Sequence, residues 1–439
     1  MELRTSEIAE ATDGRLVGPD LVVRGAAIDS RLVTGGELFV PVVAERDGHD
    51  FVGAALAAGA VAYLSARLVA GDGVEAGVAA IEVEDTVAAL ADLGRLARGR
   101  LPDRVVGVTG SVGKTSVKDL LAAALGARWS TVASAGSFNN ELGVPLTLLS
   151  AGEATEALVV EMGARGRGHI ASLSAIARPT VGVVTAVAAA HTAMFGSLDE
   201  VAAAKGELVE ALDASGVAVL NADDPRVAAM AARTEARVVR YGSDPDTDVR
   251  AEGAALDGEL RPRFRLVSPW GAADVVLAVR GEHMVGNALA AAAAALACDV
   301  PVDAVAAGLG KAELSRWRME LVRLPSGARV INDAYNANPA SMAAALRALG
   351  GLDARRRVAV LGLMAELGEA SDAEHRAVGD LARELGIEVV AVDAPAYGGT
   401  AVAGMDEAVA ALGPLGEGDA VLLKASRVVG LERLVSRLR

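Results

Sequence analysis

The sequence is poor in aromatic residues and in positive charge. Phe, Trp and Tyr make up 3% of its 439 residues, too few for the stacking surfaces that bind single-stranded nucleic acid. The formal net charge is −15, whereas a protein that binds a phosphate backbone needs a basic face. Both shortages exclude nucleic acid as an expected partner.

Cysteine and long apolar runs are also scarce. The single cysteine, Cys298, stands in an alanine-rich run, so we expect a buried thiol in a reducing compartment. The longest apolar runs, such as residues 288–298, are shorter than the ~18 residues that a membrane span requires. Residues 1–20 carry Glu, Asp and Arg instead of a secretory pattern. We therefore expect a cytoplasmic protein without membrane insertion.

What the chain does contain is a repeated alternation of strands and helices. The first ~100 residues mix a predicted strand at 37–43 with an alanine-rich helix at 51–60, and the chain breaks at 101–103. Fully apolar runs then alternate with helical stretches, which predicts a mostly parallel sheet with strands at 105–109, 157–161, 181–185 and 217–221. Residues 248–279 alternate in polarity, as in a small antiparallel insertion.

A third alternation begins near residue 314. Its strand candidates are residues 330–332, 357–362, 389–392 and 421–424. The predicted fold class is therefore α/β, with three consecutive α/β domains over residues 1–100, 101–313 and 314–439. A length of 439 residues agrees with this, because single cores stop growing well below that size.

The sharpest local motif is a glycine-rich turn between a strand and a helix. It comprises Gly110, Ser111, Val112, Gly113, Lys114, Thr115 and Ser116. Such a turn can direct backbone N–H groups and a helix N-terminus at phosphate oxygens. Lys114 would contact the β- and γ-phosphates, and the Thr115 hydroxyl would bind Mg²⁺. The usual spacing has Gly at position 108, where this chain has Val. By itself the loop predicts only nucleoside triphosphate binding.

Three further residues follow or flank the predicted strands. Glu161 ends an apolar strand, where P-loop proteins commonly place a carboxylate for Mg²⁺; the alternative is a strand-end Glu facing solvent. His191 follows another predicted strand and is a candidate for the site. The alternative is a hydrogen-bonded histidine of the core. Residues 197–200 form a predicted capping box, Ser197-Leu198-Asp199-Glu200, which begins a helix that carries Lys205. The neighbours of Lys205 are small and apolar, so its amine could be partly buried and neutral. The alternative is an ordinary surface lysine.

Taken together, these motifs resemble the Mur ligase family. The resemblance is carried by residues 29–31, 36–39 and 47–51, by the loop at 109–115, by 137–145, 161–164, 190–191, 195–197, 204–207, 281–287, 318–320, 333–342, 361–368 and 424–427. Three residues depart from the family pattern: Met284 stands where Asn is usual, Leu363 where Asp is usual and Ala425 where Gly is usual. The stretch 333–342 is most similar to the branch that adds a D-alanyl-D-alanine dipeptide.

The resemblance implies an ATP- and Mg²⁺-dependent amide ligase of peptidoglycan synthesis. Its acceptor would be UDP-N-acetylmuramoyl tripeptide, bound by the first domain, with ATP on a central P-loop ATPase-like domain. A Rossmann-like C-terminal domain would bind the dipeptide and close over ATP. We expect a monomer. Whether diaminopimelate or lysine is the third residue of the acceptor is left open, as is the base that deprotonates the dipeptide amine.

The resemblance also implies roles for individual residues. Lys205 would be carbamylated and would hold one Mg²⁺ together with Glu161 and His191, while Thr115 and Glu161 would hold the other. ATP would contact the loop 110–116, Asn287, Arg318 and Asp333. Substrates would contact Ser30, Arg31, Asn139, Asn140, Tyr335, Asn336, Asn338 and Ser341. Lys114, Glu161, His191 and Lys205 would form the catalytic set.

Two competing functions remain at this point. One is another Mur or folylpolyglutamate-type ligase, which would share the chemistry but use a different amine or acceptor. The other is a P-loop protein that binds nucleotide as a switch or scaffold without ligation. Both predict ATP binding, so only substrate-dependent turnover separates them.

Overall fold

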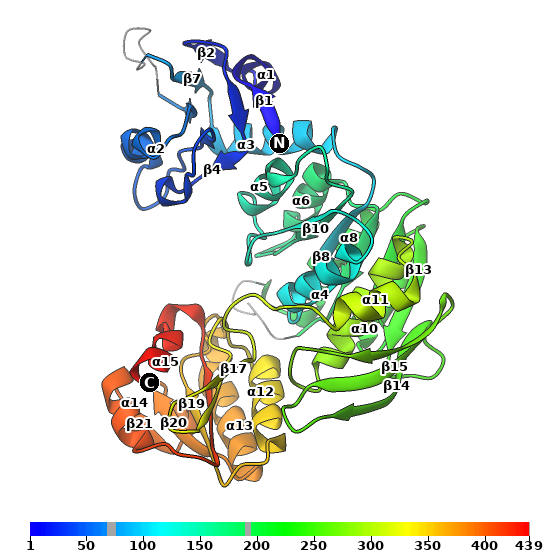
Figure 1. Ribbon diagram of the computed structural model, residues 1–439, viewed down its shortest axis with the longest axis vertical. Helices are drawn as coiled ribbons and strands as arrows, with labels where there is room; N and C mark the ends of the chain where they lie inside the picture. Colours follow the sequence, from blue (N-terminus) through cyan, green and yellow to red (C-terminus); the bar gives the residue numbers. More distant parts are fainter. Residues whose placement is uncertain (68–75, 189–194, 439) are drawn as a thin grey trace.

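A computed structural model describes residues 1–67, 76–188 and 195–438. Within these residues the strands form sheets of two, five, nine and six strands, arranged in three successive α/β units. Figure 1 shows the N-terminal unit (blue) and the C-terminal unit (yellow to red) on either side of the central unit (cyan to green). The α/β fold class predicted from the sequence is confirmed. No helix of the described residues is both long and apolar enough to cross a membrane.

The N-terminal unit is built on a small sheet of strand order β2-β7-β6-β5-β4, beside the antiparallel pair β1–β3. Its elements are β1 Glu2–Arg4, α1 Thr5–Ala11, β2 Arg15–Val17, β3 Val22–Arg24, β4 Ala26–Ala27, β5 Leu38–Phe39, α2 Val52–Ala57, β6 Ala62–Ser65, β7 Ala79–Glu82 and α3 Thr86–Arg98. The strand predicted at 37–43 is wrong in length, because only Leu38 and Phe39 belong to a strand, while Val43 forms an isolated bridge with Asp47. Pro41 lacks the N–H that a continuing ladder requires.

The central sheet has the order β16-β15-β14-β13-β12-β11-β8-β10-β9. Its elements are β8 Val105–Thr109, α4 Lys114–Gly126, β9 Thr131–Ala133, α5 Gly143–Ser150, β10 Ala157–Glu161, α6 His169–Ala177, β11 Val181–Val184, α8 Leu198–Glu210, β12 Val217–Asn221, α9 Pro225–Ala228, β13 Arg237–Gly242, β14 Val249–Leu256, β15 Pro262–Ser268, β16 Gly271–Val276, α10 Met284–Ala297 and α11 Val302–Leu309. Strands β8 to β14 pair in parallel, while β14, β15 and β16 pair antiparallel, as the sequence predicts.

Helices cover both faces of the central sheet, which buries β8, β10 and β11 completely. Helices α4 and α10 pack on one face, in a core that continues into the C-terminal unit. Helices α5, α6 and α8 pack on the other, in a core shared with α3 and the N-terminal sheet. Most of the alanine-rich α10 is buried, and so is the thiol of Cys298, the residue that follows it; this burial raises the thiol pKa to about 12.

The C-terminal unit has a sheet of order β17-β18-β22-β19-β20-β21, parallel except for the β17–β18 pair. Its elements are β17 Glu320–Arg323, β18 Arg329–Asn332, α12 Pro339–Gly351, β19 Arg356–Leu361, α13 Ser371–Glu384, β20 Glu388–Val392, β21 Thr400–Val402, α14 Met405–Leu412, β22 Asp419–Lys424 and α15 Leu434–Arg437. The four strands predicted here coincide with β18, β19, β20 and β22 to within one or two residues.

Candidate active site

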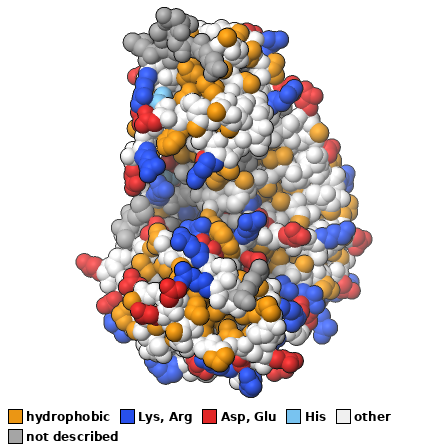
Figure 2. Space-filling view, turned by 60° about the vertical axis from the view of Figure 1, so that its left-hand side comes forward, with side chains coloured by type: hydrophobic (Ala, Val, Ile, Leu, Met, Phe, Trp, Pro, Cys, Tyr) orange, Lys and Arg blue, Asp and Glu red, His pale blue; other side chains and the backbone are white. Residues whose placement is uncertain are grey.

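A cavity of about 730 Å³ lies at the carboxyl ends of the central parallel strands. Parallel α/β sheets bind ligands at this edge. All three units contribute to the lining, with Ile28 from the N-terminal unit and residues of α12 from the C-terminal unit. Figure 2 shows a hollow across the middle of one face of the molecule, with Lys and Arg side chains around it.

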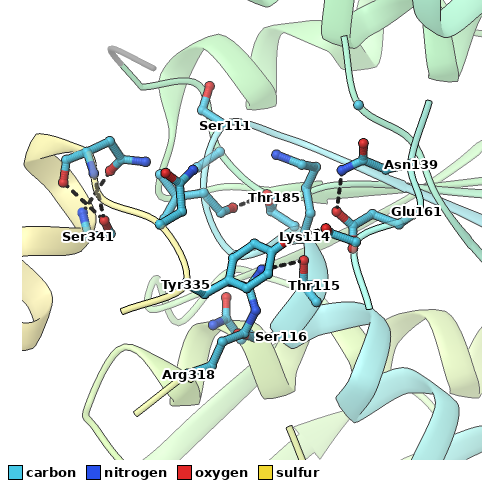
Figure 3. Close-up of a pocket in the computed structure, with 18 of the residues that line it drawn as sticks. Ser111, Lys114, Thr115, Ser116, Asn139, Glu161, Thr185, Arg318, Tyr335 and Ser341 are labelled. Atoms are coloured by element: carbon cyan, nitrogen blue, oxygen red, sulfur yellow. Dashed lines mark hydrogen bonds between the residues drawn. The ribbon is translucent and has the colours of Figure 1, made fainter. Parts of the chain in front are cut away.

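The glycine-rich turn connects β8 to α4 and forms the floor of the cavity. Gly110 has φ +148°, and a Cβ there would lie 1.9 Å from the Thr185 hydroxyl oxygen. That hydroxyl donates a hydrogen bond of 2.5 Å to the Val112 carbonyl and so fixes the turn (Figure 3). Gly113, at φ +86°, is the N-cap of α4. The turn thus has the form of a phosphate-binding loop followed by a helix N-terminus.

Two lysines line the cavity at this loop: Lys114, which is half-buried at the start of α4, and Lys205, which is buried on α8. The Lys114 ammonium donates to the Gly110 carbonyl at 2.6 Å, and burial lowers the pKa of Lys114 although the Glu161 carboxylate opposes the shift. Lys205, 2% exposed on α8, has its pKa lowered to about 7 by burial and by the positive charge of Lys114. At that pKa a large fraction of the Lys205 amine is neutral near pH 7.

Glu161 ends β10 with one carboxylate oxygen satisfied and the other not. Its Oε1 accepts a hydrogen bond of 2.8 Å from the Asn139 amide, whereas Oε2 is buried with no partner among the described residues. A buried carboxylate oxygen without a partner is costly, so the arrangement suits a bound cation. Oxygen donors from Glu161 and the Thr115 hydroxyl are the type that Mg²⁺ prefers.

The described residues include no cluster of three or more His, Cys, Asp or Glu that could hold a metal. The predicted ligand set does not depend on such a cluster, because one ligand would be a modified Lys205. His191 lies outside the described residues, so its position relative to Glu161 and Lys205 is not part of the structure.

The C-terminal unit reaches the phosphate loop through Arg318. The Arg318 guanidinium donates to the Thr115 hydroxyl at 2.8 Å and stacks on the Tyr335 ring at 4.3 Å. The Tyr335 hydroxyl in turn contacts the Ser137 hydroxyl of the central unit. Figure 3 shows Arg318 and Tyr335 lying beside Thr115 and Ser116.

A carboxylate on α4 holds the segment that leads to Arg318. Asp119 accepts hydrogen bonds from the Ser315 backbone N–H at 2.7 Å and from the Ser315 hydroxyl at 3.2 Å. The same helix that begins in the phosphate loop therefore anchors the connection between the central and C-terminal units.

Several predicted residues are engaged with each other in the C-terminal unit. Lys424, buried at the end of β22, donates to the Asp333 carboxylate at 2.5 Å and to the Asn336 carbonyl at 3.0 Å. Asn338 caps α12: its side chain accepts from the Ser341 N–H at 2.9 Å, and the Ser341 hydroxyl accepts from the Asn338 N–H at 3.1 Å. Asn338 and Ser341, which cap the helix, also line the cavity.

Most of the residues predicted from the sequence meet in this cavity. It is lined by Ser111, Val112, Gly113, Lys114, Thr115, Ser116, Asn139, Asn140, Glu161, Lys205, Asn287, Arg318, Asp333, Tyr335, Asn336, Asn338 and Ser341. Gly110, the first residue of the loop, is not among the lining residues. Ser30 and Arg31 lie outside the lining, in the short helix η1 Ser30–Leu32, where an ion pair of 2.6 Å with Arg31 lowers the pKa of Asp29 to about 2.

Other lining residues were given no role from the sequence. They include Thr185, Asn221, Tyr241, His283, Glu366 and Lys424. Thr185 directly follows β11, and Asn221 and Lys424 end their strands. A search of strand ends alone would have found these three, because polar residues there face the ligand edge of a parallel sheet.

The fold and the cavity define a P-loop nucleotide-binding protein whose third α/β unit completes the site. Comparison with known families agrees: the Mur ligase middle domain matches residues 108–295, and the Mur ligase glutamate ligase domain matches residues 317–427. A UDP-N-acetylmuramoyl-tripeptide–D-alanyl-D-alanine ligase of Mycobacterium tuberculosis (strain ATCC 25618 / H37Rv) is 45% identical over 89% of this chain and 83% of its own length. The chain belongs to the Mur ligase family, as its motifs indicate.

Solved structures are similar over nearly the whole length. MurF from Acinetobacter baumannii has a TM-score of 0.87 at 31% identity and covers 100% of this chain and 99% of its own. MurF ligase from Thermotoga maritima, solved in complex with ADP, has a TM-score of 0.81 at 29% identity, with 95% and 97% covered.

Proposed function

We propose that this protein joins D-alanyl-D-alanine to UDP-N-acetylmuramoyl tripeptide at the expense of ATP, giving the pentapeptide, ADP and phosphate in peptidoglycan synthesis. The observation that carries the proposal is the single cavity in which a phosphate loop, an unpaired Glu161 oxygen and the Lys205 amine meet under the C-terminal unit. The names of the relatives support the choice of substrates.

The chemistry explains why these groups are needed together. A carboxylate is a poor electrophile, and transfer of the ATP γ-phosphoryl group converts it into an acyl phosphate with a good leaving group. The transfer brings two anions together, so the Lys114 ammonium and the loop N–H groups must neutralise charge. Arg318, which already contacts the loop through Thr115, can add its charge from the C-terminal unit.

Mg²⁺ would be held by Thr115 and Glu161 with the nucleotide phosphates, and a second ion by Glu161, His191 and Lys205. Mg²⁺ at these sites would neutralise the negative charge that develops during phosphoryl transfer. The neutral Lys205 amine can add CO₂ and release a proton, which gives a negatively charged carbamate in place of an ammonium. Burial favours this reaction because it removes the competing cation.

We assign the three units to the three ligands. Residues 1–100 would bind the UDP-sugar, with Ser30 and Arg31 in a part of the substrate site apart from the reacting centre. Residues 101–313 would bind ATP, and residues 314–439 would bind the dipeptide and exclude water from the acyl phosphate. We further propose that the protein acts as a monomer in the cytoplasm.

Phosphate release tests the proposal. Purified protein with ATP and Mg²⁺ is given UDP-muramoyl tripeptide, D-alanyl-D-alanine, or both, with lysine and diaminopimelate forms of the tripeptide compared. We expect release only with both substrates, and a pentapeptide product by mass spectrometry. Turnover with a single amino acid or a pteroyl substrate instead would assign the protein to another branch of the family.

A further inference from the structure

Helix α4 carries an ion pair that the mechanism above does not use. Lys118 lies one helical turn after Lys114, and its ammonium is 2.7 Å from the carboxylate of Asp119. The two side chains are only 3% and 10% exposed, and neither belongs to the lining of the cavity. Two opposite charges are therefore largely enclosed close to the phosphate loop but outside the cavity itself.

The Lys118 ammonium also holds the loop that follows β9. It donates to the Ser134 carbonyl at 2.8 Å and to the Gly136 carbonyl at 3.0 Å. Together with the contact to Asp119, these bonds use all three donors of the ammonium group. The loop 134–142 contains no helix or strand that would fix it, so Lys118 attaches the start of this loop to α4.

The loop 134–142 carries side chains of the site. The Ser137 hydroxyl contacts the Tyr335 hydroxyl of the C-terminal unit. The Asn139 amide donates to the Glu161 carboxylate at 2.8 Å (Figure 3). The Ser134 hydroxyl accepts a hydrogen bond of 3.1 Å from the Glu161 N–H. A shift at the start of the loop would therefore displace groups that contact both the proposed Mg²⁺ carboxylate and the C-terminal unit.

The carboxylate of the pair leads to the C-terminal unit by a second route. Asp119 binds the N–H and the hydroxyl of Ser315, three residues before Arg318. The Arg318 guanidinium donates to the Thr115 hydroxyl at 2.8 Å and stacks on the ring of Tyr335. The ion pair is thus connected to Tyr335 twice, once through the loop 134–142 and once through Arg318.

Stability alone does not explain why charges are placed here. Replacement of a buried ion pair by apolar residues of similar size is often neutral or stabilising. An apolar side chain at position 118 could fill the same space, but it could not bind two backbone carbonyls of an irregular loop. The ammonium therefore adds a fixed position for the loop, which packing would not supply.

We propose that Lys118 is a positioning residue, which holds the loop 134–142 against α4 in the arrangement that phosphoryl transfer requires. Through this loop it sets the positions of Glu161 and Tyr335 relative to the phosphate loop. The inference rests on the proposed function. Misplacement of groups around the reacting atoms by about 1 Å can cost about 100-fold in rate. Lys118 therefore acts on the rate of the reaction, and not on the binding of nucleotide to the loop N–H groups.

The test compares two variants that differ in stability. Lys118→Met leaves the Asp119 carboxylate without its cation, so the Tm should fall. Lys118→Met/Asp119→Asn removes both charges and keeps an oxygen for the Ser315 N–H, so the Tm should return close to that of wild type. For both variants we expect kcat for ligation to fall about 100-fold, while the Kd for ADP, measured by calorimetry, stays within about threefold. If Lys118 served stability alone, kcat would recover together with the Tm.

Hydrogen exchange supplies a measurement that does not depend on ligation. In the double variant the backbone amides of the loop 134–142 should exchange about 10-fold faster or more, because local opening becomes easier. Strands β8 and β10 should exchange as in wild type. Lys311→Met, which removes an exposed lysine, is the matched control and should behave as wild type in every measurement.

Three results would overturn the proposal: recovery of kcat in the double variant, unchanged exchange of the loop 134–142, or equal losses of kcat and of ADP affinity. If the wild-type protein forms no pentapeptide, it is the proposed function that fails, and the role of Lys118 in phosphoryl transfer fails with it. Loop exchange still shows in that case whether Lys118 holds the loop, so the two failures are distinguishable.

Discussion

At the scale of single residues, the environment of Lys205 has a measurable effect on stability. The ammonium is buried 5.8 Å from the Phe195 ring centroid and close enough to Lys114 to be repelled. Burial of the charged form is therefore unfavourable, and the pKa falls from the ordinary 10.5 to about 7.

Lys205→Met should therefore raise stability in a pH-dependent way. Below pH 7 both the folded and unfolded chains carry the proton, and the full penalty, about 5 kcal/mol at most, opposes folding of the wild type. Between pH 7 and 10.5 only the unfolded chain binds it, so wild-type stability rises with pH. We expect the Tm advantage of Lys205→Met in CO₂-free buffer to be large at pH 6 and much smaller at pH 9, while ligation is lost. A constant difference would contradict this.

Glu161 offers a complementary prediction. Glu161→Gln keeps an oxygen for the Asn139 amide but removes the unpaired buried charge, so unfolding free energy should be unchanged or higher by about 1 kcal/mol. Activity should fall by ~10³-fold, the scale of lost electrostatic stabilisation. Thermal-shift measurements with and without Mg²⁺ and ATP test whether the loss of activity comes from lost Mg²⁺ binding. In that case the Mg²⁺-dependent part of the ligand-induced rise in Tm should disappear in the variant. Glu153→Gln, which makes the same change at an exposed residue, is the control.

Residue-level prediction from the sequence succeeded where a residue is tied to a motif or a strand end. The loop 110–116 and Glu161 follow apolar strands, so their neighbourhood could be predicted. The Lys424–Asp333 pair could not, because it requires that β22 lie beside β18, a pairing between strands about 90 residues apart. The roles proposed for the site residues stay predictions until they are measured.

At the scale of elements, apolar runs buried on both faces were predicted almost to the residue. Strands β8, β10 and β12 have the predicted bounds, since a fully apolar run flanked by polar residues leaves little freedom in its ends. Strand β9 was missed because it is short and half-exposed, and β13 because its outer residues are polar. The capping box at 197–200 formed only in part: Ser197 accepts from the Glu200 N–H, but the Glu200 carboxylate pairs with Arg167 at 2.6 Å.

Variants of Asn338, at the start of α12, can distinguish a capping role from a role in substrate binding. Asn338→Ala removes the acceptor for the Ser341 N–H and should cost about 1 kcal/mol of stability. Asn338→Ser keeps a capping oxygen, so it should restore most of that stability. If Asn338 also contacts the dipeptide, both variants should raise the KM for the dipeptide. Denaturant unfolding combined with steady-state kinetics distinguishes the two roles, and an unchanged KM for Asn338→Ser would leave Asn338 as a cap only.

At the scale of the whole molecule, a buried guanidinium adds to the hydrophobic core that joins the N-terminal unit to the central unit. Arg98, at the end of α3 and 5% exposed, donates to the carbonyls of Ala177 at 2.8 Å and Arg178 at 3.2 Å. It also donates to the carbonyls of Leu101 at 3.3 Å and Pro102 at 3.2 Å, in the connection to β8.

Arg98→Ala should consequently loosen this junction. Four carbonyl oxygens would lose a hydrogen-bond donor. We expect the free energy of unfolding to fall by about 3 kcal/mol, because each buried group left unsatisfied costs about 1–3 kcal/mol and water can replace part of the lost bonding. Arg98→Lys should recover less than half, since an ammonium cannot span all four acceptors. Unfolding followed by hydrogen exchange should show the N-terminal unit opening first. The exposed Arg95→Ala on the same helix is the control, and equal effects of the two would contradict the prediction.

Helix α4 begins in the phosphate loop and carries Asp119 on its second turn, where Asp119 binds Ser315 and so holds the segment that leads to Arg318. A ligand that shifts the loop therefore acts on the same rigid element that positions the C-terminal unit. Coupling free energies between two sites are reciprocal. If ATP favours the arrangement of the C-terminal unit that accepts the dipeptide, the dipeptide must strengthen the binding of ATP by the same factor. The protein would then hold its nucleotide most tightly when the second substrate is already at hand.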